Sequence, residues 1–204
     1  MIVSEASTAA AAPTGRRGAG VMRQRILEGA TEMIYANGIR GTSADRIVER
    51  VGITRVTFYR YFPTKTDLVV AYLESQAAQE SAGIEQVTAS QHGLDALLSV
   101  ASLIGEVSCM PGFRGCPFIN AAAETPDPDD PVRVVVERHR QWTKTLFASY
   151  AAEAGAVNAE AIGGQVMMLR DGAMVRGYLE DPRKVADELR RAIQAVVTAG
   201  AVTA

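Results

Sequence analysis

The sequence predicts an all-α protein, and three observations support that fold class. Apolar residues recur three and four positions apart along most of the 204 residues, which places them on one face of a helix. Glycine and proline residues separate these segments, as they commonly do between helices. No segment shows convincing alternation of apolar and polar residues between hairpin turns, so no strand is expected.

The first helix is expected over Val21–Asn37, where Ile26 and Ala30 share one apolar face. Residues 1–20 consist mainly of small and polar residues with almost no large apolar side chains, and they end in basic residues. Such a segment cannot bury enough surface to offset the entropy of ordering, so we expect a flexible tail. Gly38 then supplies the left-handed backbone that ends a helix.

The second helix is expected to be short. Thr42 stands three positions before Asp45, which is the spacing of a capping residue and its acidic partner. Ile47 and Val51 follow on one apolar face, and Gly52 ends the helix after two turns.

The third helix is expected to begin after Thr54, which can cap it, and its Phe58 and Phe62 lie four positions apart. A proline follows, and then Thr64 and Asp67 repeat the capping pattern and open a longer helix. Three helices with a tight glycine-containing connection between the second and third form the layout of a helix-turn-helix module.

The remainder is also expected to be helical. Turn-forming segments rich in proline, glycine, aspartate and asparagine separate five further amphipathic or apolar segments. These are Gly93–Met110, Cys116–Glu124, Val132–Ala154, Ala159–Leu179 and Pro182–Thr198.

Charge is distributed unevenly along the chain. Residues 16–65 contain ten basic and four acidic residues and carry +6, whereas the rest contains eleven basic and nineteen acidic residues and carries −8. This asymmetry suggests that the N-terminal segment meets a polyanion. The alternative is a basic face that is merely solvated.

The third helix carries the side chains suited to DNA. Burial of Phe58 and Phe62 turns the other side chains of this helix outward. Arginine can read guanine, threonine offers a hydroxyl and a methyl group to bases, and tyrosine hydroxyls suit phosphates. The outward residues are Arg55, Thr57, Tyr59, Arg60 and Tyr61, beside Lys65, although the two tyrosines could instead be surface fillers.

This region resembles the DNA-binding domain of the TetR family of bacterial transcriptional regulators. The matching features are Gly-x-x-x-Thr from Gly38, an eight-residue amphipathic helix, Val-Gly-Ile, Phe-Tyr-x-Tyr-Phe and Lys-x-x-Leu. The close match covers roughly residues 21–76. The resemblance implies a helix-turn-helix domain over residues 21–81, followed by a helical effector-binding and dimerisation domain over residues 82–204.

The resemblance also implies roles for individual residues. Thr42 would bind phosphate, three residues of the third helix would face the bases, and its neighbours would grip the DNA backbone. The implied base-facing set is Arg55, Val56 and Thr57, and the backbone set is Tyr59, Tyr61 and Lys65, with Arg60 in either role. Arg16, Arg17 and Arg23 would form a basic arm, unless they lie in a solvated tail.

A homodimeric repressor follows from the same resemblance, released from a palindromic operator by an unknown small-molecule effector. The partners are therefore double-stranded operator DNA, a second copy of the chain and that effector. The last two helices would pair across the dimer, because Gly163, Gly164, Gly172 and Gly177 allow close approach of helix backbones. The alternative is that their apolar stripes pack only within one subunit.

Candidate effector-pocket residues mix aromatic, thioether and polar character in the C-terminal part. Most of them could simply belong to the core. They are Met110, Phe113, Cys116, Phe118, Asn120, Trp142, Phe147, Met167 and Met168. Cys116 near a helix N-terminus could also be a redox or electrophile sensor, with Arg114 lowering its pKa, or else an inert buried thiol.

Several other classes of protein are disfavoured by the sequence. Cys109, Cys116, His92 and His139 are too few and scattered for a zinc module or a disulfide framework, so no metal or cofactor is expected. No membrane span or secretory signal is present, which favours the cytoplasm. No catalytic motif appears. The alternative function is a helical enzyme or small-molecule-binding protein whose basic N-terminal helices are structural.

Overall fold

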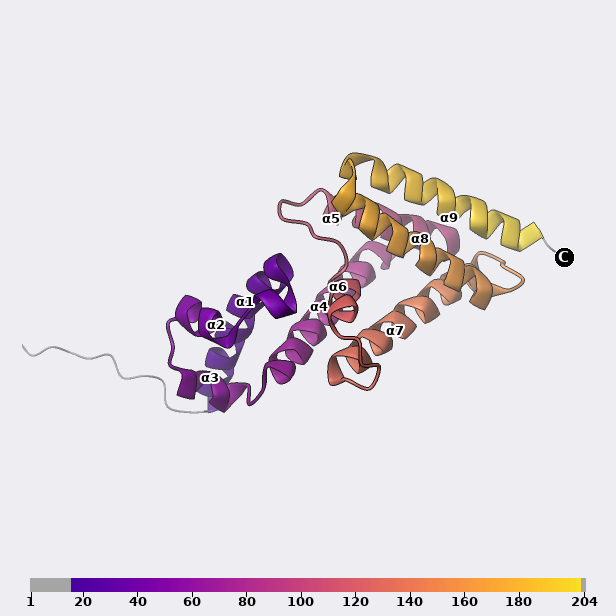
Figure 1. Cartoon of the computed structure of the whole chain (residues 1–204). Coiled ribbons are helices and arrows are strands. Elements are labelled where there is room, and N and C mark those ends of the chain that lie inside the picture. Colours follow the sequence, from indigo (N-terminus) through magenta and orange to yellow (C-terminus); the bar gives the residue numbers. More distant parts are fainter. Residues whose placement is uncertain (1–15, 203–204) are drawn as a thin grey trace, which may run out of the picture.

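The computed structural model describes residues 16–202, and throughout that part of the chain the regular elements are helices (Figure 1). The prediction of an all-α fold with an N-terminal helix-turn-helix is confirmed. The helices are α1 (Arg16–Gly41), α2 (Ala44–Val51), α3 (Arg55–Tyr61), α4 (Lys65–Thr88), α5 (Gly93–Ser108), α6 (Pro117–Glu124), α7 (Pro131–Glu153), α8 (Ala159–Leu179) and α9 (Val185–Val202), with a 3₁₀ turn over Pro182–Lys184 before α9.

The first helix differs from the prediction at both ends. It begins at Arg16 rather than Val21, so residues 16–20 are helical and do not belong to a tail; residues 1–15 of the expected tail lie outside the described residues. At its other end the backbone of Gly38 is non-helical, with φ of 81°, and one more turn follows to Gly41. The expected stop near Asn37 is therefore a kink.

Side-chain caps fix the three short connections of the N-terminal unit. Ser43, rather than Thr42, caps α2, because its side chain accepts a hydrogen bond from the backbone N–H of Arg46. Thr54 caps α3 in the same way, and Thr64 forms a reciprocal capping box with Asp67 at the start of α4.

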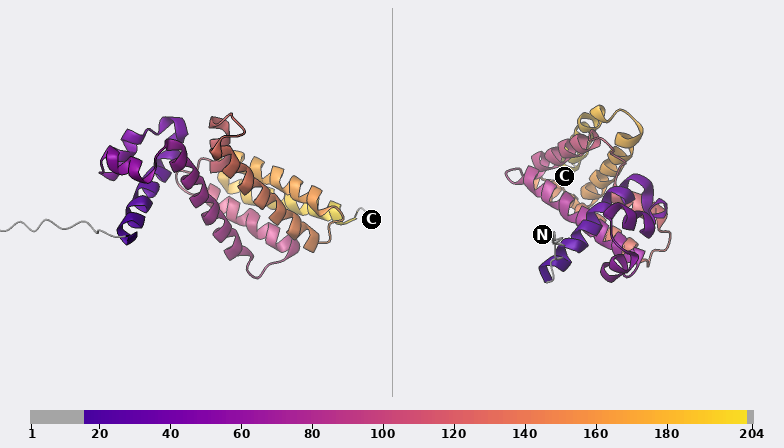
Figure 2. Two further views of the ribbon diagram at one scale, coloured as in Figure 1. Left: turned by 90° about the horizontal axis from the view of Figure 1, so that it is seen from below. Right: turned by 90° about the vertical axis from the view of Figure 1, so that its left-hand side faces the viewer.

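A small apolar core holds α1, α2 and α3 against the beginning of α4. Its fully buried side chains include Ile26, Ile47, Phe58, Phe62 and Leu68. Figures 1 and 2 show this unit at one end of the molecule, with α8 and α9 side by side at the other. Because α4 runs unbroken through residue 81, the two expected domains share one helix.

The C-terminal helices approach one another closely at two glycines. A Cβ at Gly105 of α5 would lie 2.3 Å from the Cβ of Ala186 in α9, and one at Gly163 of α8 would lie 2.7 Å from the backbone nitrogen of Ala148 in α7. Only glycine permits these crossings. Along residues 16–202, none of the helices combines the length and the apolar character needed to cross a bilayer.

Candidate DNA interface, ligand cavity and dimer surface

The exposed face of α3 is the candidate DNA interface. Phe58 and Phe62 are each 1% exposed, as the spacing predicts, so the remaining side chains of this helix face outward. Val56 is 72% exposed and Tyr59 is 49% exposed, with the Tyr59 ring packed edge-on against Phe58 at 5.2 Å between ring centroids. Arg60 is also exposed. Val56, Tyr59 and Arg60 therefore form the solvent-exposed surface of this helix together with Arg55.

Arg55, the first residue of α3, is held in place by a residue of α2. Its guanidinium donates to the carboxylate of Asp45 at 2.5 Å, and both side chains are exposed. The hydrogen bond and the charge of Asp45 raise the pKa of Arg55. The guanidinium of Arg55 is therefore directed from the N-terminus of α3 toward the first turn of α2.

The other predicted DNA-contacting residues of α3 and α4 are half-buried. Thr57 is half-buried, and its hydroxyl lies 2.9 Å from the hydroxyl of Thr54. Tyr61 is half-buried against the core, and Lys65 is the half-buried first residue of α4. The guanidinium of Arg23 lies 4.8 Å from the ring centre of Phe62, so this residue of the expected arm packs on the three-helix core.

The expected phosphate contact from the Thr42 side chain is corrected by the structure. Thr42 is 0% exposed, and its one hydroxyl proton is shared between the backbone carbonyls of Met33, at 3.0 Å, and Gly38, at 2.9 Å. The kink at Gly38 frees that carbonyl from the helix, which gives the threonine a structural partner. Ser43, the capping residue at the N-terminal end of α2, is exposed.

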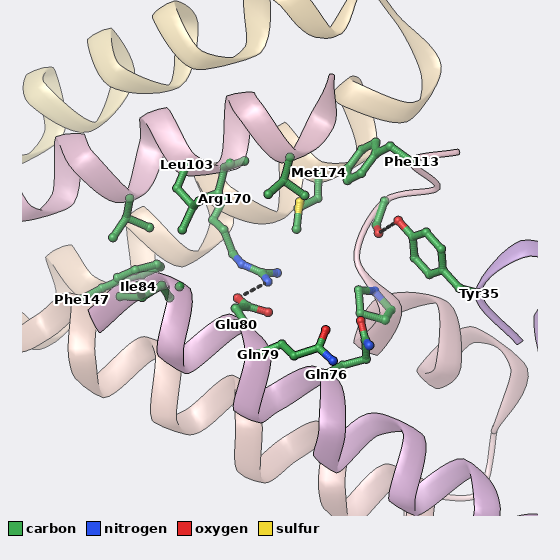
Figure 3. Close-up of a pocket in the computed structure, with 16 residues that line it drawn as sticks. Tyr35, Gln76, Gln79, Glu80, Ile84, Leu103, Phe113, Phe147, Arg170 and Met174 are labelled. Carbon is green, nitrogen blue, oxygen red and sulfur yellow. Dashed lines mark hydrogen bonds and ion pairs between the residues drawn. The ribbon is translucent and has the colours of Figure 1, made fainter. Parts of the chain in front are cut away.

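A cavity of about 290 Å³ lies inside the C-terminal part, bounded by α4, α5, α7 and α8 and the segment before α6 (Figure 3). Its wall is mostly apolar, and its polar side chains come from α1, α4 and α8. The apolar lining includes Ile84, Val100, Leu103, Ile104, Val107, Phe113, Phe147 and Met174, and the polar lining is Tyr35, Gln76, Gln79, Glu80 and Arg170.

An ion pair between α4 and α8 forms the polar side of the cavity. The side chain of Arg170 is 3% exposed, and it donates to Glu80 at 2.7 Å and to Asp171 at 3.2 Å. The second oxygen of Glu80 lies 3.1 Å from Nε2 of His139. Burial would raise the pKa of Glu80, but the hydrogen bond with His139 and the charge of Arg170 outweigh burial and lower it to about 2. Glu80 is therefore a carboxylate at neutral pH.

Of the predicted pocket residues, Phe113 and Phe147 line this cavity, and the others do not. Some are exposed and others belong to the core or to different surface depressions. Met110 and Met168 are exposed, Phe118 and Met167 are buried, Asn120 lies in a depression between α1 and α6, and Trp142 lies beside His139 on α7.

Cys116 lies behind the cavity rather than in its lining. It is 2% exposed, and its sulfur accepts a hydrogen bond from Arg170 at 3.3 Å. Of the two alternatives for this residue, burial favours an inert thiol over an electrophile sensor.

The end of α1 is tied to the C-terminal part by hydrogen bonds around Tyr35 and Glu124. The Tyr35 hydroxyl donates to the carbonyl of Gly115 at 2.9 Å and accepts from the backbone N–H of Arg114 at 2.8 Å. At the end of α6, the carboxylate of Glu124 accepts from the backbone N–H groups of Ile39 and Arg40, both at 2.8 Å. Tyr35 also lines the cavity, so one side chain of α1 reaches both the cavity and the backbone of Arg114 and Gly115.

An apolar stripe runs along the outer face of α8. Met168, Val175 and Leu179 are 68%, 46% and 69% exposed, and Gly172 lies between them at helical spacing. A Cβ at Gly172 would meet nothing within 4 Å. Gly163 and Gly177 instead face Ala148 and Ser108 inside the same subunit. Of these three predicted interface glycines, Gly172 is the one that faces outward.

Comparisons with known proteins agree with this arrangement. Residues 26–72 match the family model for bacterial regulatory proteins of the tetR family. The chain is 27% identical over 166 residues to the HTH-type transcriptional regulator LmrA of Bacillus subtilis (strain 168), a match that spans 74% of this chain and 87% of LmrA.

Solved structures share the fold over nearly their whole length. The crystal structure of SCO4454, a TetR-family transcriptional regulator from Streptomyces coelicolor, superposes with a TM-score of 0.85 at 37% identity, covering 89% of this chain and 97% of that one. A putative TetR-type regulator from Streptomyces avermitilis, sav143, superposes with a TM-score of 0.79 at 20% identity, covering 88% and 97%.

Proposed function

Because the chain belongs to the TetR family of bacterial transcriptional regulators, we propose that it is a homodimeric repressor that a small molecule releases from a palindromic operator. The observation that carries the DNA-binding part of this proposal is the outward face of α3. That face presents Arg55, Val56, Tyr59 and Arg60 on a helix whose opposite face is locked into the three-helix core. A recognition helix fixed in this way can enter the major groove as a rigid body.

The proposed contacts follow from the position of each residue. Arg55 and Thr57 stand near the N-terminal end of α3, where a recognition helix meets base edges, and exposed Val56 can pack against a thymine methyl group. Tyr59, Arg60, Tyr61 and Lys65 flank them and suit phosphates. Residues 21–81 would then form the DNA-binding domain, and residues 82–204 the effector-binding and dimerisation domain.

Release by an effector is supported by the position of Tyr35. A molecule in the cavity would touch Tyr35, and through it the Arg114–Gly115 backbone that holds the end of α1. If a molecule bound in the cavity favours a different separation of α1 and α6, the N-terminal unit moves. The spacing of the two recognition helices in the dimer would then change. Operator affinity would then fall by the coupling free energy, typically ~1–3 kcal/mol.

The test is selection of bound sequences from a random duplex library by the full chain, followed by anisotropy measurements at several salt concentrations. We expect a palindrome to be enriched, with affinity that falls steeply as salt rises. A scrambled duplex of the same composition is the control. Failure to enrich any sequence, with equal and weak binding to both duplexes, would contradict a sequence-specific regulator and favour a helical binding protein.

Exchange of Arg55 or Lys65 for alanine should separate base reading from phosphate contact. Arg55→Ala is expected to reduce the preference for operator over scrambled DNA at least tenfold, because each lost base contact is worth ~1–3 kcal/mol. Lys65→Ala is expected to weaken binding to both duplexes and to make the slope of log K against log salt shallower by about two, one phosphate per subunit. Equal effects of the two variants on both duplexes would show that α3 is not the reading element.

A further inference from the structure

We propose that the cavity selects an uncharged molecule of one or two rings with one polar edge that both accepts and donates hydrogen bonds, as an amide does. The inference rests on the proposed function only in that this molecule would be the effector. The three properties, which are size, absence of charge and a two-sided polar edge, each follow from a separate feature of the cavity.

The size follows from the volume. The cavity holds about 290 Å³, roughly twice the ~150 Å³ cavity that accommodates a single benzene ring. Side chains on facing helices form its walls, with Ile84 of α4 and Leu103 of α5 among them (Figure 3). A molecule of one or two rings would fill this space.

The absence of charge follows from a balance among the ionic side chains. Arg170 contacts Glu80 and Asp171, and Arg140 forms a second pair with Asp171 at 2.7 Å, so two guanidinium groups meet two carboxylates. Nε2 of His139 also lies 3.1 Å from Glu80, and when this imidazole is neutral the five side chains carry no net charge. A carboxylate on the ligand would compete with Glu80 for Arg170 and would leave one excess negative charge in a mostly apolar space. An ammonium group would leave one excess positive charge. Either ion would lose its hydration without gaining a counter-charge of its own.

The polar edge follows from hydrogen-bonding capacity that remains in the Arg170–Glu80 pair. Within residues 16–202, Arg170 donates to Glu80, Asp171 and Cys116, which leaves two of the five N–H groups that a guanidinium carries. The two oxygens of Glu80 accept from Arg170 and contact His139, and a carboxylate can accept about four bonds. Both side chains line the cavity and lie against each other, so a ligand there meets a donor from Arg170 and an acceptor from Glu80, which match the C=O and N–H of an amide.

The test is calorimetric titration of the wild-type full chain, without DNA, against a matched series of two-ring probes. Naphthamide, naphthoate, naphthylmethylammonium and methyl naphthoate, substituted at the same ring carbon, differ in charge and hydrogen bonding but little in size. We expect naphthamide to bind at least tenfold more tightly than the two ions, and more tightly than the ester, which lacks the donor. Binding of either ion within threefold of the amide, or no binding of the amide at about 1 mM, would overturn the proposal.

A charge variant tests the cause. Glu80→Gln removes one carboxylate and leaves a guanidinium in excess, so we expect its preference to reverse, with naphthoate bound at least threefold more tightly than naphthamide. The double variant Glu80→Gln/Arg170→Gln restores the balance and should again reject both ions. An unchanged preference in folded Glu80→Gln would contradict the charge-balance argument. The wild-type series decides the ligand class even if Glu80→Gln does not fold.

The proposed regulator function and the proposed ligand class are tested by independent experiments. Operator selection without any probe tests the regulator, and titration without DNA tests the cavity. Naphthamide that binds but leaves operator affinity unchanged would confirm the ligand class and contradict the effector role of that cavity.

Discussion

Exchange of Gly172 for glutamate is expected to dissociate the proposed dimer and to reduce operator affinity by roughly 10²–10⁴-fold. Gly172 lies in the middle of the exposed apolar stripe of α8, between Met168 and Val175, where a Cβ meets nothing within the subunit. The isolated subunit therefore tolerates the new side chain, whereas a partner helix packed closely on this face does not. A monomer would bind half a palindrome and would lose the effective concentration that links the second recognition helix to the first.

Ala152→Glu is the control for this experiment. Ala152 is an exposed residue near the end of α7, so the exchange adds the same charge outside α8. Sedimentation of both variants, with circular dichroism to verify folding, and operator anisotropy provide the comparison. If Gly172→Glu remains dimeric with wild-type affinity, the outer face of α8 is not the dimer interface. If the control also dissociates, the effect is a general response to added charge.

The physical basis of the proposed interface is the exposure of apolar side chains on a helix that already packs on its other face. Met168, Val175 and Leu179 occupy positions that repeat at intervals of three, four and seven residues, and the facing side of α8 packs on α7 and α9. Contiguous exposed apolar surface of this kind marks interaction sites in soluble proteins. A solvent-facing helix of a monomer would carry charged residues there instead.

The helix-turn-helix could be predicted in detail because local rules define it. Thr54 and the Thr64–Asp67 pair act within three or four residues, and the Phe58–Phe62 spacing identifies the buried face of α3 without reference to the rest of the chain. The cap of α2 is an exception, since Ser43 rather than Thr42 fills it. The sequence could not show that the Thr42 hydroxyl lies against the carbonyls of Met33 and Gly38, because that contact depends on how α1 ends.

The cavity could not be predicted, because its chemistry depends on contacts between distant segments. Glu80 and Arg170 are 90 residues apart, and each alone looks like a solvated residue of an amphipathic helix. Their pairing, and the burial of Arg170, exist only once α4 and α8 have both packed on α5 and α7. The search for aromatic and methionine residues instead favoured side chains such as Met110 and Phe118, which the fold places in solvent and in the core.

The glycines of α8 illustrate the same limit. The sequence indicates that small residues allow close helix approach, but it does not say which helix approaches. In the structure Gly163 contacts the backbone of α7, Gly177 contacts Ser108 of α5, and Gly172 faces outward. The glycines of α8 therefore serve two purposes. Gly163 and Gly177 allow close packing within the subunit, and Gly172, as we propose, allows pairing between subunits.

Exchange of Gly163 for alanine is expected to destabilise the fold, while the same exchange at its neighbour Gly164 should stabilise it. A Cβ at Gly163 would lie 2.7 Å from the nitrogen and 2.8 Å from the Cα of Ala148, so the backbones of α7 and α8 must separate. Overpacking of this kind costs ~1–3 kcal/mol, which exceeds the ~0.5–1 kcal/mol that alanine gains over glycine in a helix. At Gly164 the gain applies without the clash.

Urea unfolding at one fixed protein concentration measures both effects, since dimer stability depends on concentration. We expect the urea midpoint of Gly163→Ala to fall and that of Gly164→Ala to rise. In thermal unfolding, the midpoint temperatures should move in the same directions by about 2–4 °C per kcal/mol for a chain of this size. The sign of the difference between neighbouring residues is informative, because helix propensity is the same at both positions. If both variants were stabilised, α7 and α8 would have room to separate, and the close crossing would not be what requires glycine at residue 163.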